Sequence, residues 1–239
     1  MQILSILQTS SYEDIAVRAA FTLAFAGFLR VGEFTYRGTD HDLELGPAFP
    51  NWFQTKGCIR IIAQGQHIEL TLPASKTDPF SKEIKLIIAS SGDEACPVQA
   101  MKQLFAIDTH WPLLAPLFYI SKYDQRPFSR EYVVQKLQTL AIFAGLGTGT
   151  WNGHSLHRGA ATWAAEVGIP EKEIQTLGRW RSEAYMAYIE YSRDEQISLS
   201  KLFQKKAKCN HPLFSGWYLQ QVTTWFAKQS LLNSNSKLR

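Results

Sequence analysis

The chain has 239 residues with a formal net charge of +4, and 45% of its residues are hydrophobic. This length and apolar content suffice for one large core or two small ones. The longest apolar runs fall well short of the roughly 20 residues that a membrane-spanning helix needs, so we expect no membrane partner. The first residues lack the pattern of a signal peptide. The cysteines (Cys58, Cys96 and Cys209) are isolated, which predicts neither a disulfide framework nor a zinc site and favours a reducing compartment.

The charge is distributed unevenly along the chain. Residues 201–239 carry seven basic and no acidic side chains, whereas residues 1–200 carry 18 basic and 21 acidic ones. A basic tail is typical of contact with nucleic acid or another polyanion, but many such tails are only solvated ends. The sequence leaves both interpretations open.

The first half of the chain predicts one helix and a small sheet. Apolar side chains recur at spacings of three and four over residues 12–29, which indicates a helix. A loop rich in Gly, Pro and Asp follows over residues 38–52. Residues 58–63, 67–72 and 83–89 read as three strands of an antiparallel sheet.

Capping residues indicate helices throughout the second half. Pro97 and Pro170 suit first helical turns. Ser129 is a good N-cap, and Gly145 and Gly168 suit positions just beyond helix ends. The expected helices run over residues 97–108, 129–144, 154–167, 170–178, 182–191 and 195–207. This order of elements predicts an α+β fold, mostly helical, with the three-stranded sheet near the N-terminal third.

Two groups suited to phosphate chemistry lie in the first half. Arg30 and Glu33, in FLRVGEF, follow the strongly apolar helix. Such an arginine either forms a surface salt bridge or presents its planar guanidinium group to an anion. The nearby Glu33 is consistent with both interpretations. Lys76 and Thr77 lie in the loop ASKTDPFS between two predicted strands. A loop lysine is usually only solvated, but this one could reach a bound phosphate.

A third group opens the helix over residues 154–167. His154, His157 and Arg158 lie where backbone N–H groups and the helix dipole favour an anion. The two histidines are three residues apart and could share a face toward a metal ion, but no Cys, Asp or Glu nearby completes a ligand set. A capping or packing role for one histidine is the alternative.

A fourth group is the segment LGRWRSEAYMAYIEYS. Tyr185, Tyr188 and Tyr191 recur every three residues, a spacing that is more typical of packing than of chemistry. Trp180, just ahead of them, would ordinarily belong to a core.

The order of these four groups resembles the tyrosine recombinase (phage integrase) family. An arginine, a hairpin lysine, His-x-x, Gly-Arg-Trp and a tyrosine follow one another as in that family. The stretch HSLHRGAATWAAEVGIPEKEIQTLGRWRSEAYMAYI looks especially like recombinases of the eukaryotic DNA elements called Cryptons and related fungal proteins. The resemblance covers residues 11–203 and is most specific over residues 153–189. It implies a catalytic domain over residues 1–203, followed by a basic, aromatic tail over residues 204–239.

The resemblance implies a role for each matched residue. Arg30 would be the first catalytic arginine, supported structurally by Glu33. Lys76 would protonate the leaving 5′ oxygen, and Tyr188 would be the nucleophile. Trp180, or Arg179 beside it, would fill the position that supports the phosphate. The implied catalytic set is Arg30, Lys76, His154, His157, Trp180 and Tyr188, and the implied DNA contacts are Thr77, Arg158, Arg179 and Arg181.

The chemistry of that family explains these residue types. Attack by a tyrosine oxygen builds negative charge on phosphorus, which arginine forks stabilise. A lysine supplies the proton that lets the sugar oxygen leave. The covalent 3′-phosphotyrosine stores the bond energy, so neither a metal nor another cofactor is expected. The expected partner is double-stranded DNA, and the family and substrate imply a nuclear location.

Two features depart from the family pattern. His157 stands where the family has arginine, and a neutral histidine offers one donor where arginine offers five. Losing such a donor costs on the order of 10² to 10³ in rate, part of which protonation below about pH 6.5 could recover. The first arginine is residue 30, so we also expect the family's N-terminal DNA-clamping domain to be absent.

Three alternatives to an active recombinase remain open. The chain could be a catalytically impaired DNA-binding module derived from a recombinase. It could also be a nicking and closing enzyme that resembles type IB topoisomerases, or a metal hydrolase that uses His154 and His157. The tail could mediate a homo-oligomer on DNA, or its aromatic residues could pack on its own domain.

Overall fold

The computed structural model divides the chain into two compact units, residues 1–190 and residues 191–239. The second unit lies almost wholly outside the residues that the structure describes. The same holds for the predicted loop over residues 38–52, the loop that carries Lys76, and the predicted helices over residues 182–191 and 195–207. The described residues are 2–8, 10–36, 56–72, 84–108, 115–123, 126–149, 151–180, 182, 183, 186, 197 and 201.

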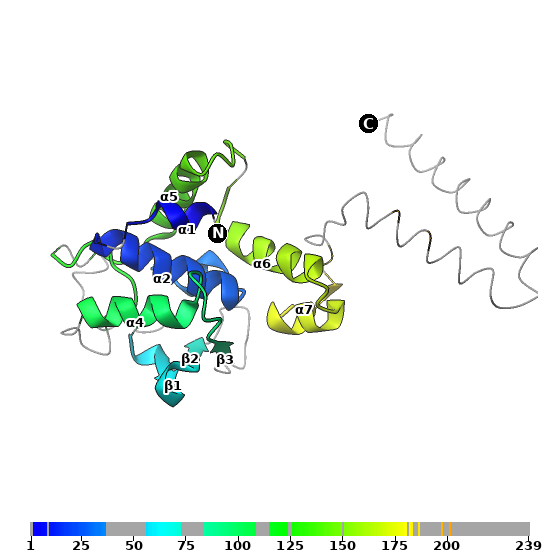
Figure 1. Ribbon diagram of the computed structural model, residues 1–239, viewed down its shortest axis with the longest axis horizontal. Helices are drawn as coiled ribbons and strands as arrows, with labels where there is room; N and C mark the ends of the chain where they lie inside the picture. Colours follow the sequence, from blue (N-terminus) through cyan, green and yellow to red (C-terminus); the bar gives the residue numbers. More distant parts are fainter. Residues whose placement is uncertain are drawn as a thin grey trace, which may run out of the picture. The chain divides into compact units, whose positions relative to one another are not determined.

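Helix α2 (Tyr12–Ala26) is central to the first unit (Figure 1). The Ser11 side chain accepts a hydrogen bond from the Asp14 backbone N–H at 3.4 Å, which caps the helix. Its apolar faces pack against α4 (Pro97–Ile107) and α6 (Ser155–Glu166). The short helix α1 (Gln2–Ile6), which the sequence did not predict, is held to α2 because Arg18 donates to the carbonyl oxygens of Leu4 and Leu7 at 2.6 and 3.2 Å.

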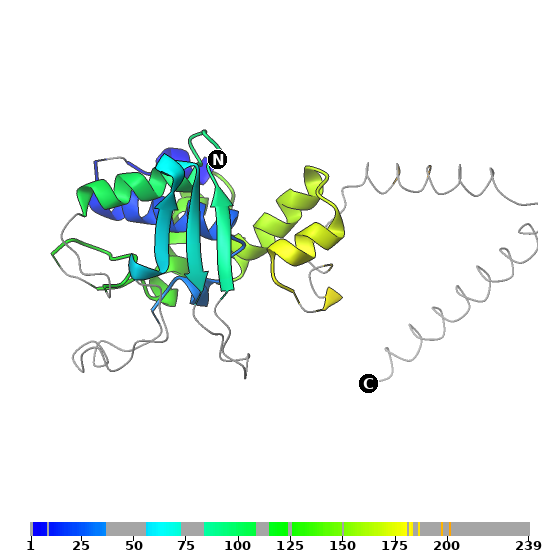
Figure 2. The ribbon, with the colours of Figure 1, turned by 90° about the horizontal axis from the view of Figure 1, so that it is seen from below.

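The predicted antiparallel sheet is confirmed, in the order β1 (Ile59–Ile62), β2 (His67–Leu72) and β3 (Ile84–Ala89). Figure 2 shows the three strands side by side, with α2 and α4 behind them. Alternate side chains of β2 are buried, and Ile68 pairs in register with Ile88 of β3. This period-2 pattern places one face of the sheet on the main core.

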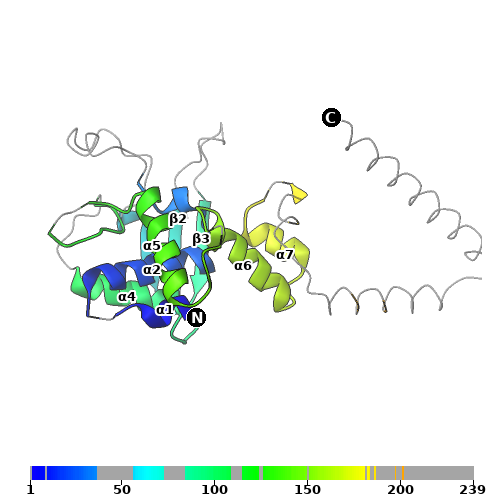
Figure 3. The ribbon, with the colours of Figure 1, turned by 90° about the horizontal axis from the view of Figure 1, so that it is seen from above.

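The chain after α4 contains the helices α5 (Arg130–Phe143), α6 and α7 (Glu171–Leu177) (Figure 3). Ser129 caps α5 by accepting the Tyr132 backbone N–H at 3.1 Å, as predicted. Gly145 and Gly168 follow α5 and α6 with φ angles of 72° and 82°, a conformation that favours glycine. None of the described helices is long and apolar enough to cross a membrane.

A second, smaller core lies where α6 and α7 meet the C-terminal end of α2. Phe28 packs there against the alanines of α6 and against Ile174 of α7, and Trp180 covers the cluster. Phe28 of this small core lies two residues before Arg30 in the sequence.

Candidate functional site

The turn that carries Arg30 begins with a reversal of the chain at the end of α2. Gly27 ends the helix, and Phe28 adopts a left-handed conformation with φ of 48°. That region is unfavourable for a bulky residue, so surrounding contacts must hold Phe28 there. Arg30 then leads into the short 3-10 helix η1 (Val31–Glu33).

Glu33 holds the turn through both carboxylate oxygens. Oε2 accepts the Arg30 backbone N–H at 2.8 Å, and Oε1 accepts from Arg30 Nη1 at 3.3 Å. Oε2 also accepts from Arg179 Nη2 at 2.8 Å. Two guanidinium groups therefore share one carboxylate, and the cluster keeps an excess positive charge. The Arg30 side chain is 39% exposed, so it is the cation of this cluster that is open to an anion.

Arg179 directs its head group into the protein. Nη1 donates to the carbonyl oxygens of Gly27 at 3.0 Å and Leu177 at 3.3 Å. Nη2 donates to the carbonyl oxygen of Phe28 at 2.9 Å as well as to Glu33. Each terminal nitrogen thus uses both of its hydrogens on protein acceptors. The side chain is only 12% exposed, and burial lowers the pKa of Arg179, against the opposing effect of Glu33.

His157 is buried in the small core, with 1% of its surface exposed. Its Nδ1 lies 2.7 Å from the carbonyl oxygen of Phe28, so Nδ1 carries the hydrogen and donates it. Burial lowers the pKa of His157 to about 4, and the charge of Arg30 acts in the same direction. The expectation that His157 becomes charged below about pH 6.5 is therefore wrong, because a buried imidazolium is poorly solvated. The packing role, left open by the sequence, is the one observed.

Trp180 also belongs to the small core. Its ring lies 4.4 Å from the His157 ring between centroids, and it meets the Phe28 ring edge-on at 6.4 Å. A Cβ atom on Gly178 would overlap the Trp180 ring, which explains the glycine of the Gly-Arg-Trp sequence. The core placement agrees with the alternative that the sequence left open, and contact of Trp180 with a phosphate stays a prediction.

The N-terminus of α6 lies directly against the Arg30 turn. The Gly153 carbonyl oxygen accepts the Val31 backbone N–H at 3.3 Å, and a Cβ atom on Gly153 would come within 2.6 Å of Val31 Cγ1. His154 occupies the N-cap position and is exposed, and its backbone N–H donates to Asn152 Oδ1 at 2.8 Å. Arg158 is half-buried one turn later. This contact places a helix N-terminus beside the turn of Arg30.

His154 and His157 differ in environment, since one is exposed and the other is buried. Within the described part of the chain, no group of three or more His, Cys, Asp or Glu residues is placed to hold a metal ion. The metal-hydrolase alternative therefore gains no structural support from these two histidines.

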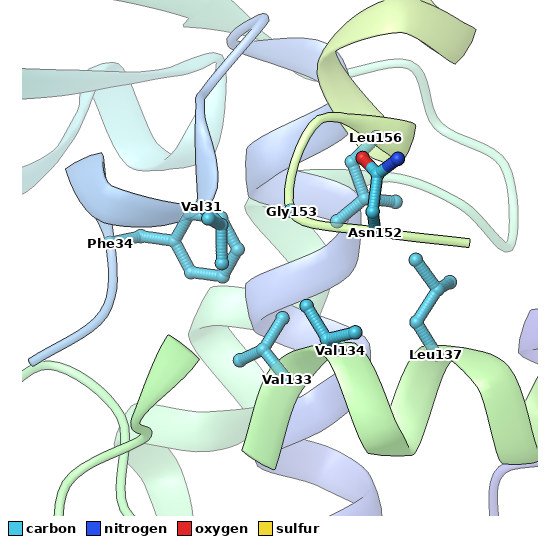
Figure 4. A pocket seen from close by; sticks show the side chains of 8 residues that line it. All are labelled: Val31, Phe34, Val133, Val134, Leu137, Asn152, Gly153 and Leu156. Atoms are coloured by element: carbon cyan, nitrogen blue, oxygen red, sulfur yellow. The ribbon is translucent and has the colours of Figure 1, made fainter. Parts of the chain in front are cut away.

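An apolar pocket lies behind the turn (Figure 4). Val31 and Phe34 lie opposite Val133 and Val134 of α5, so apolar side chains anchor the turn to that helix. The pocket is lined by Val31, Phe34, Val133, Val134, Leu137, Asn152, Gly153 and Leu156.

The structure thus brings together groups from three distant segments. Arg30 and Glu33 meet Arg179, and the His157 and Trp180 rings lie next to the same turn. The residues of the expected site that lie outside the described residues are Lys76, Thr77, Arg181 and Tyr188. The sequence did not predict that His157 and Arg179 both bind the carbonyl oxygen of Phe28, because a backbone oxygen has no signature in the sequence.

Comparison with known proteins finds likeness in structure alone. No family model matches the sequence, and no curated protein matches it. Among solved structures, the XerH site-specific recombinase in a post-cleavage complex with difH is 12% identical, with a TM-score of 0.59 over 85% of this chain and 49% of that one. This chain has the fold of a recombinase catalytic domain.

Two further solved structures have a similar fold. XerA recombinase is 16% identical, with a TM-score of 0.54 over 84% of this chain and 60% of that one. The Tn1549 transposon integrase in complex with transposon right-end DNA is 12% identical, with a TM-score of 0.51 over 85% of this chain and 63% of that one. This chain therefore spans about half to under two thirds of the length of the recombinases that it resembles.

Proposed function

We propose that this chain is the catalytic domain of a tyrosine recombinase, which breaks and rejoins DNA strands during recombination or integration of a mobile element. The observation that carries the proposal is the half-exposed guanidinium of Arg30. Glu33 holds it in a turn that abuts the N-terminus of α6, within a recombinase fold. The likeness of residues 154–189 to Crypton recombinases supports a Crypton-type origin, and the family and its DNA substrate support a nuclear location.

Besides water, the proposed reaction needs no group beyond the side chains of the chain. The Tyr188 hydroxyl loses its proton to water, and its oxygen attacks the phosphorus of a phosphodiester and forms a 3′-phosphotyrosine bond as the bond from phosphorus to the 5′ oxygen breaks. Arg30 stabilises the non-bridging oxygens as negative charge builds on them, with His154 nearby at the helix N-terminus. Lys76 gives its proton to the 5′ oxygen. Attack by a 5′ hydroxyl on the phosphotyrosine reverses these steps and reseals the strand.

The partner that fits this chemistry is double-stranded DNA. The basic tail over residues 204–239 supplies positive charge for the phosphate backbone, and its aromatic residues suit either assembly on DNA or packing on its own domain. The structures similar to this chain include recombinases bound to DNA, which supports the same class of partner.

Covalent trapping tests the proposal. The protein is incubated with a pool of nicked random duplexes that cannot religate, and a denaturing gel is examined for a protein–DNA adduct. Wild type should form an adduct, whereas Tyr188→Phe and Arg30→Ala should not. Sequencing of the trapped DNA then identifies preferred sites. An adduct that persists in Tyr188→Phe would contradict the assignment of the nucleophile.

A second candidate is a DNA-binding module that no longer cuts. It is favoured by His157, which is buried and uncharged where the resemblance places a phosphate-binding arginine. Salt-dependent binding of DNA by a protein that forms no adduct would select this candidate. Sequence-independent relaxation of supercoiled plasmid would instead select the topoisomerase-like alternative.

A further inference from the structure

Two segments that are far apart in the sequence meet at the end of α2. The chain from Gly27 to Glu33 forms the turn that carries Arg30, and Arg179 follows α7 about 150 residues later. Phe28 and Arg179 both adopt left-handed conformations, with φ of 48° and 56°. A non-glycine residue in this region is strained and persists only where its surroundings require it. Here the two strained residues are joined directly, since Arg179 donates to the carbonyl oxygen of Phe28.

We infer that Arg179 is a positioning residue, which holds the turn from Gly27 to Glu33 and thereby fixes the orientation of Arg30. The catalytic consequence rests on the proposed function, whereas the positioning itself does not. Arg179 precedes Tyr188 by nine residues in the sequence. Arg179 itself is bound to the turn that carries the proposed phosphate-binding arginine.

The geometry of the hydrogen bonds favours this role over a DNA contact. Arg179 binds the turn at three points, the carbonyl oxygens of Gly27 and Phe28 and the Glu33 carboxylate. The same Glu33 oxygen accepts the Arg30 backbone N–H, so Arg179 and Arg30 share an anchor atom. Arg179 is much less exposed than Arg30, at 12% against 39% of the side chain. A planar fork with donors at fixed angles suits these acceptors, and a lysine ammonium can reproduce only part of the set.

The experiment compares three variants of the full chain: Arg179→Ala, Arg179→Lys and Arg18→Ala. Arg18 is a matched control, because its guanidinium also binds two backbone carbonyl oxygens but holds α1, away from the turn. The first readout is amide hydrogen exchange, measured by NMR, over residues 30–34 and over α2 and α4. The second is the single-turnover rate of adduct formation on a nicked duplex, with the dissociation constant for DNA measured alongside.

If Arg179 positions the turn, Arg179→Ala should accelerate exchange over residues 30–34 by about tenfold, the effect of losing roughly one hydrogen bond. Exchange within α2 and α4 should stay near the wild-type rate. Adduct formation should slow by on the order of 10²-fold, as for a small misplacement of a reacting group, while the dissociation constant changes little. Arg179→Lys should recover part of both losses, and Arg18→Ala should affect neither.

The inference is overturned if exchange over residues 30–34 is unchanged in Arg179→Ala, or if it rises equally throughout α2 and α4. A DNA contact would show itself by weaker binding and a salt slope smaller by about 0.9, with no change in exchange. If wild type forms no adduct, the proposed function fails. The hydrogen-exchange data still test the positioning role of Arg179 in that case, since their measurement requires no catalysis.

Discussion

The side chains of His157 and Arg179 bind one backbone oxygen, the carbonyl of Phe28, at 2.7 and 2.9 Å. A carbonyl oxygen has two lone pairs and can accept both bonds. The charge of Arg179 disfavours a second positive charge beside it and helps to keep His157 neutral, although burial is the larger cause. The turn that leads to Arg30 is thus held by one neutral and one cationic donor, His157 of α6 and Arg179 just after α7.

The neutral state of His157 predicts a loss of stability in mild acid. The pKa of an unperturbed histidine is about 6.5, and burial lowers the pKa of His157 to about 4 in the folded protein. Between these values the unfolded chain binds more protons, so the free energy of unfolding decreases as the pH falls from 6.5 to 4. The full loss is at most about 3 kcal/mol.

Urea unfolding between pH 7 and pH 4 measures this effect. His157→Asn is the matched variant, because its amide N–H can donate to the Phe28 carbonyl oxygen but does not titrate in this range. The variant should lose less stability than wild type over the same interval. Equal losses in the two proteins would contradict the assignment of the titration to His157.

Introducing the family's arginine at position 157 should destabilise the protein rather than activate it. In His157→Arg the new guanidinium would place a charge at a site with 1% exposure, next to the guanidinium of Arg179. A buried, poorly paired charge costs on the order of 3 kcal/mol or more. Thermal unfolding of His157→Arg should show a clear decrease in Tm, whereas His154→Arg, at the exposed N-cap, should change Tm little. A variant with wild-type Tm and faster adduct formation would contradict this prediction and favour a lost catalytic arginine.

Gly153 should not tolerate a side chain. In Gly153→Ala the new Cβ atom would come within 2.6 Å of Val31 Cγ1, so the Arg30 turn or the start of α6 must move. Such overpacking typically costs about 1–3 kcal/mol. Urea unfolding should detect the loss, and adduct formation should slow. Gly149→Ala is the control in the same loop, since its Cβ would meet Trp151 only at 3.4 Å; equal effects in both variants would contradict the prediction.

Arg30→Ala should impair cleavage more than binding. The guanidinium is partly exposed and is expected to act on charge that develops in the transition state, so its loss should lower the cleavage rate by on the order of 10² to 10³. DNA affinity should fall only by the amount that one phosphate contact contributes to binding. Single-turnover trapping and fluorescence anisotropy measure the two quantities. Equal fractional losses of both would contradict the catalytic assignment.

Binding of DNA should weaken with salt. The slope of log affinity against log salt concentration should be near −0.9 for each phosphate contacted. Removing residues 204–239, which carry six of the basic side chains, should reduce the steepness of that slope. Titrations between about 50 and 200 mM salt measure it. A flat response in the full chain would contradict DNA binding.

The sequence by itself determined most of the described secondary structure. Helical periodicity, the Ser129 cap and the glycines at positions 145 and 168 placed the helices within a few residues of the observed ends, because these signals act within one or two turns. The short helix α1 escaped prediction, since it has few residues and depends on hydrogen bonds from Arg18, a tertiary contact.

Part of the candidate site was likewise predictable from the sequence, and part of it depends on the tertiary structure. The sequence order singled out Arg30, Glu33 and the Gly-Arg-Trp segment, because side-chain type and spacing are visible in it. Only the tertiary structure decided that Arg179 faces inward onto the turn and that His157 is buried and neutral. Both outcomes depend on desolvation and on the backbone oxygen of Phe28, which are set when distant segments pack together and leave no trace in local residue spacing.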